Sequence, residues 1–348
     1  MYDYIIVGAG SAGCVLANRL SEDPANRVLL LEAGPSDWHP FIHMPAGLAK
    51  LVGKKGVNWD YTTAPQAGLG NRPLWWPRGK VLGGSSSINA MCYIRGNARD
   101  YDEWAELGAE GWHWDNVLPY FKRSEGNERG SEYHGGDGPL GVSDPRHKNP
   151  LSEVFLEAAR QAGHAPSEDF NGARQEGFGW YQTTTRDGAR SSSAQAYLKP
   201  VRKRPNLKVI TRATASRVTI TDGRATGVVY SVDGKGAFHE VAAKEVILSG
   251  GAINSPQLLM LSGIGPAAHL RQHGIDVVRD LPGVGGNLQD HLDVCTLQRC
   301  VRGLSYDQLS DVAVGLQYYL FKKGPGTSNI AETGGFMRSA LAEDERPD

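Results

Sequence analysis

The first thirty residues alternate between short apolar runs and an amphipathic stretch. Residues 4–7 (Tyr-Ile-Ile-Val) form a continuous apolar run, as a buried strand does, and residues 27–31 (Arg-Val-Leu-Leu-Leu) indicate a second strand that is apolar after its first residue. Between them, residues 14–20 carry apolar side chains at helical spacing. A glycine-rich segment, residues 8–13, stands between the first run and the helical stretch. The pattern predicts a strand, a tight turn, a helix and a second strand.

The glycines of this turn suit the binding of a dinucleotide. Gly8 permits the turn, Gly10 lets the backbone approach a pyrophosphate, and Gly13 lets the helix pack close to the strand. The free N–H groups at the helix start then face the phosphates. Glu32, 19 residues after Gly13, can accept hydrogen bonds from ribose hydroxyls and disfavours the 2′-phosphate of NADP. A turn that merely closes a βα unit is the alternative. The candidate cofactor residues here are Gly8, Gly10, Ser11, Ala12, Gly13, Glu32 and Ala33.

A second glycine-rich segment, residues 79–87, favours FAD over NAD. A nicotinamide enzyme has no evident need for another glycine-serine loop so soon after the first unit, and the serines offer hydroxyl and N–H groups to anionic oxygens. A flexible surface linker is the alternative. The flanking residues 75–77 and 88–93 are too apolar for a solvated linker, so we expect a buried loop whose backbone groups have partners.

Further elements follow from the rest of the pattern. Residues 151–162 read as a helix, and residues 191–200 as a capped helix start. Turn signals at 221–223 and 232–234 separate short alternating segments, which predicts antiparallel strands. Those strands are expected at residues 207–210, 216–220, 225–230 and 238–241. Residues 245–251 read as a last buried strand running into a glycine turn, after which Ser255 caps a helix that has Pro256 at its first position.

Length and charge favour a catalytic protein that acts on small molecules. The 348 residues can bury a large core and predict two domains. With 37 basic and 38 acidic residues, the formal net charge is −1, and there is no electrostatic footprint of nucleic-acid binding. No run approaches the length of a membrane span, and the N-terminal apolar stretch carries Asp3 rather than a basic leader, so no signal peptide is expected. Peripheral association with a membrane stays open.

The four cysteines lack the spacing of a metal site or a disulfide framework. They are Cys14, Cys92, Cys295 and Cys300. Because no CxxC pair occurs, neither zinc nor any other metal is predicted. Cys14 and Cys92 lie in apolar surroundings, where buried free thiols are common. The pattern favours a reducing compartment and therefore a cytoplasmic location.

Several separated motifs resemble one known family. Residues 79–102 (Gly-Lys-Val-Leu-Gly-Gly-Ser-Ser, then Ile88-Asn89, Tyr93, Gly96 and Asp102) resemble the first signature of the glucose-methanol-choline (GMC) flavoprotein oxidoreductases. Residues 251–265 resemble the second signature. With the Gly8 motif, residues 32–34 and residues 281–291, the likeness covers nearly all of the chain.

The resemblance implies an α/β fold with a Rossmann-type FAD-binding domain, additional antiparallel strands and an incomplete α+β substrate domain. The expected FAD-binding parts are residues 1–144 and 188–292, and the expected substrate-domain parts are residues 145–187 and 293–348. The excursion at residues 35–77 is expected to cover part of the cofactor. The resemblance adds further cofactor-binding candidates, which are Val81, Gly84, Ser85, Asn89, Ala90, Met91, Cys92 and Ala215.

The implied activity is FAD-dependent oxidation of a primary alcohol, either choline or an aliphatic or aromatic alcohol, to the aldehyde. Hydride passes to flavin while a base removes the hydroxyl proton. Histidine suits that base, but none of the ten histidines has a spacing that marks it as catalytic: His39, His43, His113, His134, His147, His164, His239, His269, His273 and His291. In the family the catalytic histidine lies in a C-terminal portion, so we expect it beyond residue 348 and name no catalytic residue. The electron acceptor, whether oxygen, quinone or another, is undetermined.

Two other functions stay open at this point. A family lyase would use the same fold with FAD in a structural role, although the lack of a signal peptide makes the secreted plant lyases less expected. The chain could also be a non-catalytic flavin binder or an unstable fragment. A choline site would want an aromatic cage, for which the tryptophans of the excursion are available, although tryptophan there is more often packing. They are Trp38, Trp59, Trp75 and Trp76.

Overall fold

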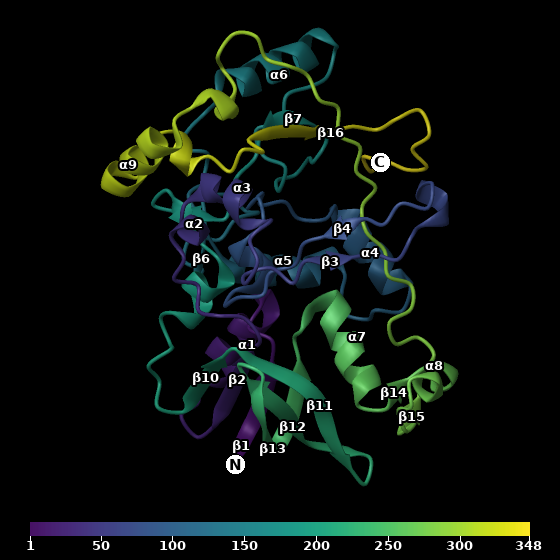
Figure 1. The fold of residues 1–348 in the computed structure, drawn as a ribbon. Coiled ribbons are helices and arrows are strands. Elements are labelled where there is room, and N and C mark those ends of the chain that lie inside the picture. The colour runs from purple at the N-terminus through teal and green to yellow at the C-terminus, as the bar shows by residue number, and fades with distance from the viewer. The chain divides into compact units, whose positions relative to one another are not determined.

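The computed structural model describes the backbone of residues 1–348 and the side chains of all residues except 235–241 and 243. The chain forms two compact units, each assembled from separated stretches (Figure 1). The first unit comprises residues Met1–Trp38, Leu51–Ile88 and Ser193–Leu297, and the second comprises His39–Lys50, Asn89–Ser192 and Gln298–Asp348. The units are defined by contacts rather than by function, so the expected division into FAD and substrate domains stays a prediction.

A six-stranded sheet forms the centre of the first unit, in the order β10-β2-β1-β13-β12-β11 (Figure 1). The strands are β1 (Tyr2–Val7), β2 (Val28–Glu32), β10 (Leu207–Thr211), β11 (Ala213–Thr221), β12 (Arg224–Val232) and β13 (Lys235–Leu248). The short pairs are β3 (Tyr61–Thr62) with β4 (Trp75–Trp76) and β14 (Ile264–Gly265) with β15 (Arg279–Asp280). The helices are α1 (Ser11–Leu20), α7 (Gly251–Leu261) and α8 (Ala267–Gln272), with 3-10 turns η2 (Ala67–Leu69) and η3 (Gly84–Ser87).

The main sheet joins a parallel half to an antiparallel half. β1 pairs in parallel with β2 and β13, and β10 pairs in parallel with β2. β12 pairs antiparallel with both β11 and β13. The predicted α/β class with Rossmann-type and antiparallel parts is therefore confirmed.

Two strand predictions need correction. Residues 207–210 were expected among the antiparallel strands, but β10 runs parallel to β2. Residues 238–241 and 245–248 were expected as two strands, but they belong to the single 14-residue β13. One long strand suffices because its first part pairs with β12 and its last part with β1.

Burial explains why β2 is apolar at every position except its last residue, Glu32. β2 lies between β1 and β10, and all five of its residues are buried. A strand covered on both faces needs apolar side chains at every position rather than at alternate ones. The core cluster at this sheet consists of Ile5, Leu29, Leu31, Ala213, Val228, Tyr230 and Ala242.

The predicted start of the helix after β13 is wrong. α7 begins at Gly251 instead of at Pro256, and Ser255 lies inside it, where its Oγ accepts a hydrogen bond from the N–H of Gly250 at 3.0 Å. Gly251 has φ +84°, a conformation open to glycine, so the chain can turn directly from strand into helix. The predicted helix start at residues 191–200 is a single π-helical turn, η4 (Ala194–Leu198).

The second unit is built from helices and short two-stranded pairs. Its α-helices are α2 (Pro40–His43), α3 (Leu48–Leu51), α4 (Ala98–Glu106), α5 (Trp114–Ser124), α6 (Pro150–Gln161) and α9 (Asp311–Phe321). Its strand pairs are β5 (Glu125–Asn127) with β6 (Leu140–Val142), β8 (Thr185–Arg186) with β9 (Ala189–Arg190), and β7 (Gly177–Trp180) with β16 (Thr333–Phe336). Its 3-10 turns are η1 (Pro45–Gly47), η5 (Tyr306–Gln308) and η6 (Pro325–Thr327). The helix predicted at residues 151–162 corresponds to α6.

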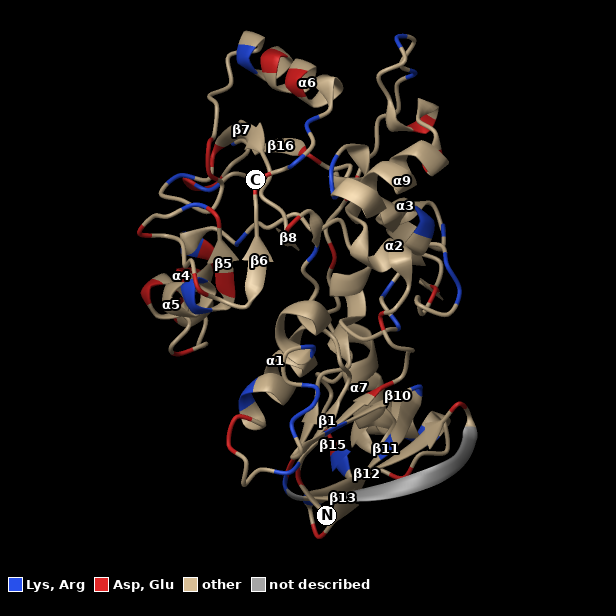
Figure 2. Ribbon diagram, turned by 90° about the vertical axis from the view of Figure 1, so that its left-hand side faces the viewer, with Lys and Arg blue, Asp and Glu red and all other residues tan. Residues whose placement is uncertain are grey.

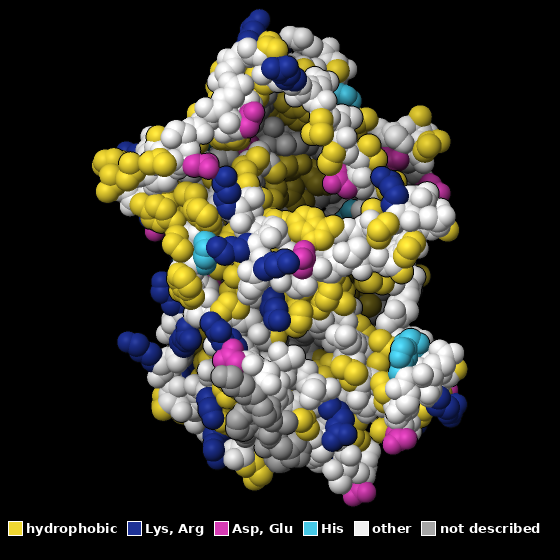
Figure 3. Space-filling model, in the orientation of Figure 1, with side chains coloured by type: hydrophobic (Ala, Val, Ile, Leu, Met, Phe, Trp, Pro, Cys, Tyr) yellow, Lys and Arg dark blue, Asp and Glu magenta, His cyan; other side chains and the backbone are white. Residues whose placement is uncertain are grey.

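The surface carries interspersed charge, and α9 presents exposed apolar side chains. Basic and acidic residues are mixed over the ribbons of both units (Figure 2). Apolar side chains gather on α9, where Val312, Leu316 and Leu320 are exposed (Figure 3). These residues are spaced by four and therefore lie on one face of the helix. None of the helices in the described part of the chain has both the length and the apolar character of a membrane span.

Candidate functional site

A cavity of about 750 Å³ in the first unit lies where its parallel strands end. Val7 of β1, Glu32 of β2 and Leu248 of β13 are the last residues of their strands, and all three line it. In open α/β sheets, ligands bind at the carboxyl ends of the strands. The position of the cavity therefore marks it as the candidate site.

Most of the predicted cofactor residues line this cavity. Those that do are Gly8, Gly10, Ser11, Ala12, Glu32, Ala33, Gly84, Ser85 and Ala215. Gly13 and Val81 belong to the same unit and are buried beside the cavity-lining segments. Asn89, Ala90, Met91 and Cys92 belong to the second unit. The structure thus brings the two glycine-rich segments together, and the roles of all these residues stay predictions.

Close backbone contacts explain the glycines at the turn. Gly8 has φ +99°, and a Cβ on Gly13 would lie 1.8 Å from the carbonyl oxygen of Gly8. A Cβ on Gly84 would lie 2.7 Å from the Cα of Gly10. By contrast, a Cβ on Gly10 would meet no atom nearer than the Cα of Gly84, at the ordinary contact distance of 3.9 Å. Gly8, Gly13 and Gly84 are therefore required by the fold, whereas Gly10 leaves room above the backbone.

Two helices begin at the cavity wall. Ser11 and Ala12 of α1, and Gly251 and Ala252 of α7, all line it. The N-cap residues of both helices are glycines, which have no side chain to occupy the first N–H groups. The partial positive charge at both helix starts favours an anionic group in the cavity.

Glu32 is a buried carboxylate in the same wall. Its Oε2 accepts a hydrogen bond from the N–H of Ala9 at 2.9 Å, and its Oε1 accepts one from the N–H of Gly34 at 2.8 Å. The side chain is only 6% exposed, and this burial raises the pKa of Glu32 to about 7, although the two backbone donors oppose the shift. The carboxylate is thus fixed in orientation, with hydrogen-bonding capacity left toward the cavity.

Aromatic residues of the excursion complete the cavity, and sequence reasoning missed one of them. Trp59 and Tyr61 line the cavity and stack on each other, with ring centroids 5.7 Å apart and planes at 7°. The hydroxyl of Tyr61 donates to Oδ1 of Asn254 in α7 at 2.5 Å. Trp59 was considered only as a cage residue, and no local pattern marked Tyr61.

The segment Asn89–Cys92 is held by hydrogen bonds within the second unit. Nη1 of Arg190 donates to the carbonyl oxygen of Asn89 at 2.8 Å and to its Oδ1 at 2.9 Å. Nδ2 of Asn329 donates to the carbonyl oxygen of Ala90 at 2.8 Å. Met91 is 1% exposed, whereas Cys92 is exposed, so the expectation of a buried Cys92 thiol is wrong. Met91 fills the interior here, which leaves Cys92 outside; Cys14 is buried as expected.

The histidines do not gather at the cavity. None of the described side chains that line it is a histidine. His134 is buried in the second unit between two carboxylates, an environment that no sequence spacing indicated. The side chain of His239 lies outside the described ones.

Comparison with known protein families identifies the chain. The family model described as GMC oxidoreductase matches residues 2–293. The chain belongs to the GMC oxidoreductase family.

Curated GMC relatives are about half identical to this chain. It is 54% identical over 357 residues to the alcohol dehydrogenase (acceptor) of Pseudomonas putida, with 100% of this chain and 64% of the relative covered. It is 52% identical over 352 residues to the mitochondrial choline dehydrogenase of Homo sapiens, with 97% of this chain and 59% of the relative covered. The chain therefore spans about three fifths of the length of these relatives.

Solved GMC structures share the fold. A formate oxidase from Aspergillus oryzae, described with respect to its FAD modification, superimposes with a TM-score of 0.88 at 31% identity, covering 97% of this chain and 62% of that one. The pyridoxine 4-oxidase described as from Mesorbium loti has a TM-score of 0.77 at 38% identity, covering 81% of this chain and 56% of that one.

Proposed function

We propose that this chain carries the FAD site of a flavoprotein that oxidises a primary alcohol to the aldehyde. The observation that carries the proposal is the meeting of both glycine-rich segments, Gly8–Gly13 and Gly79–Ser87, at one cavity with two helix starts and a buried carboxylate. The cavity volume of about 750 Å³ lies in the range of roughly 300–1,000 Å³ that small-molecule sites occupy. The donors in its wall suit a diphosphate.

Each part of the dinucleotide has a proposed partner. The diphosphate would lie against the N–H groups of Ser11 and Ala12, where Gly10 leaves space. The Glu32 carboxylate would accept hydrogen bonds from the adenosine ribose, and Ala215 would lie beside the adenine. The segment Asn89–Cys92 would contact the flavin ring, as the family resemblance implies.

The relatives support the substrate class. Curated relatives of this chain are named as alcohol and choline dehydrogenases, so we propose a primary alcohol, with choline among the candidates. When bound, the flavin supplies the hydride acceptor. The residues described here hold and orient that cofactor, and the base that takes the hydroxyl proton is proposed to lie in the part of the relatives that this chain does not span. A cytoplasmic location stays a prediction from the cysteine pattern.

Valine at Gly10 tests the cofactor placement. The variant Gly10→Val adds a side chain into space that the fold leaves open, so it should fold normally and lose at least nine tenths of its bound flavin. Gly53→Val is the matched control, because a Cβ there meets no atom within 4 Å, so it too should be tolerated by the fold, but Gly53 does not line the cavity. Flavin content comes from the absorption spectrum, and folding from circular dichroism and the melting temperature. A Gly10→Val variant with full flavin would contradict the proposed site.

A further inference from the structure

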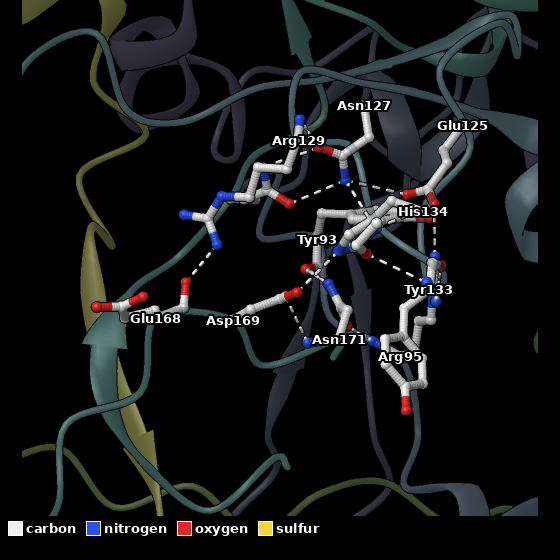
Figure 4. A network of polar contacts seen from close by, with 12 residues as sticks. Tyr93, Arg95, Glu125, Asn127, Arg129, Tyr133, His134, Glu168, Asp169 and Asn171 are labelled. Carbon is white, nitrogen blue, oxygen red and sulfur yellow. Dashed lines mark hydrogen bonds and ion pairs between the residues drawn. The ribbon is translucent and has the colours of Figure 1, made fainter. Parts of the chain in front are cut away.

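A buried ionic network lies in the second unit, outside the cofactor cavity (Figure 4). His134 stands at its centre: its Nδ1 lies 3.1 Å from Oε1 of Glu125, and its Nε2 lies 2.9 Å from Oδ2 of Asp169. Nη2 of Arg95 donates to the same Glu125 oxygen at 2.6 Å. The side chains of Arg95, Glu125 and His134 are 2%, 0% and 0% exposed. Such charges are stable in the interior only when they are paired.

The geometry favours a form of His134 in which both ring nitrogens carry hydrogen. A neutral imidazole has one N–H group, whereas here each ring nitrogen faces a carboxylate oxygen. The amide nitrogen of Asn127 is 3.0 Å from Nδ1, but its two hydrogens have acceptors in Oε2 of Glu125 and Oε1 of Gln182. The imidazolium form therefore gives each ring nitrogen of His134 a carboxylate acceptor.

The balance of charges in the network also favours the imidazolium form of His134. Two carboxylates, the buried Glu125 and the partly buried Asp169, face one guanidinium, Arg95, so a neutral histidine would leave an excess negative charge in this network. Protonated His134 makes the charges equal. The hydrogen bonds and negative charges of Asp169 and Glu125 raise the pKa of His134 to about 9, against the effect of burial.

The network is attached to the backbone that follows Asn89–Cys92. Asn171, whose N–H donates to Oδ1 of Asp169 at 3.0 Å, donates from Nδ2 to the carbonyl oxygen of Tyr93 at 2.8 Å. Its Oδ1 accepts from the N–H of Arg95 at 2.7 Å. A second attachment runs through Gln182, whose side chain bonds Asn127 in both directions and whose carbonyl oxygen accepts from the N–H of Tyr93 at 2.8 Å. His134 is thus linked to residues 93–95 along two routes.

We propose that His134, held as an imidazolium between Glu125 and Asp169, is a positioning residue for the segment Asn89–Cys92. The charge fixes Asp169 and Glu125. Asp169 accepts from the N–H of Asn171, and Glu125 accepts from Asn127, which bonds Gln182. Asn171 and Gln182 in turn hold the backbone of Tyr93 and Arg95. The inference rests on the proposed function in one respect. His134 affects flavin binding only if Asn89–Cys92 contacts the flavin, as proposed above. The attachment of the backbone itself does not depend on flavin.

The pH dependence has a defined sign. The raised pKa means that the contribution of His134 is complete below about pH 6.5, its ordinary value, and is lost as the pH rises through about 9. Other charged groups share a cavity with His134 and can modify this profile: they are Arg129, Asp144, Lys148, Glu168 and Asp169. Arg129 and Asp144 are paired with each other at 2.8 Å, so their charges cancel. Arg95 and Glu125 face the other ring nitrogen.

Hydrogen exchange at Tyr93 and Arg95 tests the attachment directly in the full chain. Their amide protection, corrected for the intrinsic rate at each pH, should fall at least tenfold in the wild type as the pH rises from 7 to 10. In His134→Gln, protection should already be at least tenfold lower at pH 7 and should change little with pH. His113→Gln, at an exposed histidine of the same unit, is the matched control and should behave like the wild type.

A charge-balanced double variant separates positioning from packing. His134→Gln leaves two carboxylates facing one guanidinium, and adding Asp169→Asn makes the charges equal again. Protection at Tyr93 and Arg95 should therefore be higher in the double variant than in His134→Gln alone. A double variant that is worse than both single variants would mean that His134 acts through packing alone, and the proposal would be wrong. If the single variants fail to fold, the wild-type pH profile still decides: flat protection up to pH 10 overturns the proposal.

Flavin retention, measured on the same samples, separates this inference from the proposed function. Loss of both amide protection and flavin in His134→Gln supports the whole proposal. Unchanged protection overturns the positioning role, whatever happens to flavin. Lost protection with full flavin retention overturns the contact between Asn89–Cys92 and flavin, on which the role in cofactor binding rests.

Discussion

Glu32 is a buried carboxylate whose ionised form is costly to the fold when no ligand is bound. Both of its oxygens accept backbone N–H groups, yet burial still raises its pKa to about 7. A carboxylate whose pKa is raised in the folded state adds stability below its ordinary pKa of 4.5 and loses that contribution as the pH rises through about 7. Bound ribose hydroxyls would supply the hydrogen bonds that water supplies to an exposed carboxylate.

The variant Glu32→Gln should remove this pH dependence. In the cofactor-free wild type, the free energy of unfolding should fall by up to about 3 kcal/mol from this group between pH 4.5 and just above pH 7. The curve of Glu32→Gln should lack that fall, while the exposed control Glu110→Gln should keep it. Urea denaturation at a series of pH values measures the difference. Parallel curves for the wild type and Glu32→Gln would disprove the assignment.

At the residue scale, the sequence predicted the positions that a local pattern of neighbouring residues constrains. Gly8 and Gly13 stand in a strand-turn-helix pattern, and a turn of that kind restricts which residues can occupy it. Tyr61 and His134 were not found, because Asn254 lies 193 residues from Tyr61, and Asp169 lies 35 residues from His134. Such pairings leave no local pattern.

At the scale of elements, the short pair β3–β4 is joined to α7 by one hydrogen bond. The hydroxyl of Tyr61 in β3 donates to Oδ1 of Asn254, and both residues line the cavity. Tyr61 is partly buried, which raises the pKa of its hydroxyl and keeps it a donor at neutral pH. The bond therefore links the excursion to the helix that begins at the cavity.

A double-mutant cycle measures that link. Tyr61→Phe and Asn254→Ala should each destabilise the fold by about 1 kcal/mol, and the double variant should cost less than their sum by about 0.5–1.5 kcal/mol, because both remove the same bond. Urea denaturation of the four proteins gives the coupling energy. Strict additivity would show that the bond does not join the two elements.

The sequence predicted the type of each helix or strand better than its end residues and its pairing with other strands. The strand predicted at residues 27–31 corresponds to β2, whose residues are all buried. The prediction succeeded because a central parallel strand needs a nearly continuous apolar run. The Ser255-Pro256 signal misplaced the start of α7, because Gly251 allows the helix to begin directly after β13. β10 was assigned to the wrong pairing, since alternation in the sequence does not reveal the direction of the neighbouring strand.

At the scale of the whole molecule, membership of the GMC family follows from motifs spread along the chain. The two glycine-rich segments lie far apart in the sequence and meet at one cavity, which the family resemblance implied but neither segment could indicate alone. The second unit carries a separate buried network of charged side chains. The sequence could not predict this network, because its residues are separated along the chain and come together only in the folded structure.

The absorption spectrum of the purified protein tests the central claim, that the cavity of the first unit binds FAD. The account predicts oxidised-flavin bands that correspond to about one flavin per chain, with FAD identified by chromatography after denaturation. A protein that is folded by circular dichroism, carries no flavin when purified and takes up none when incubated with FAD would contradict the account.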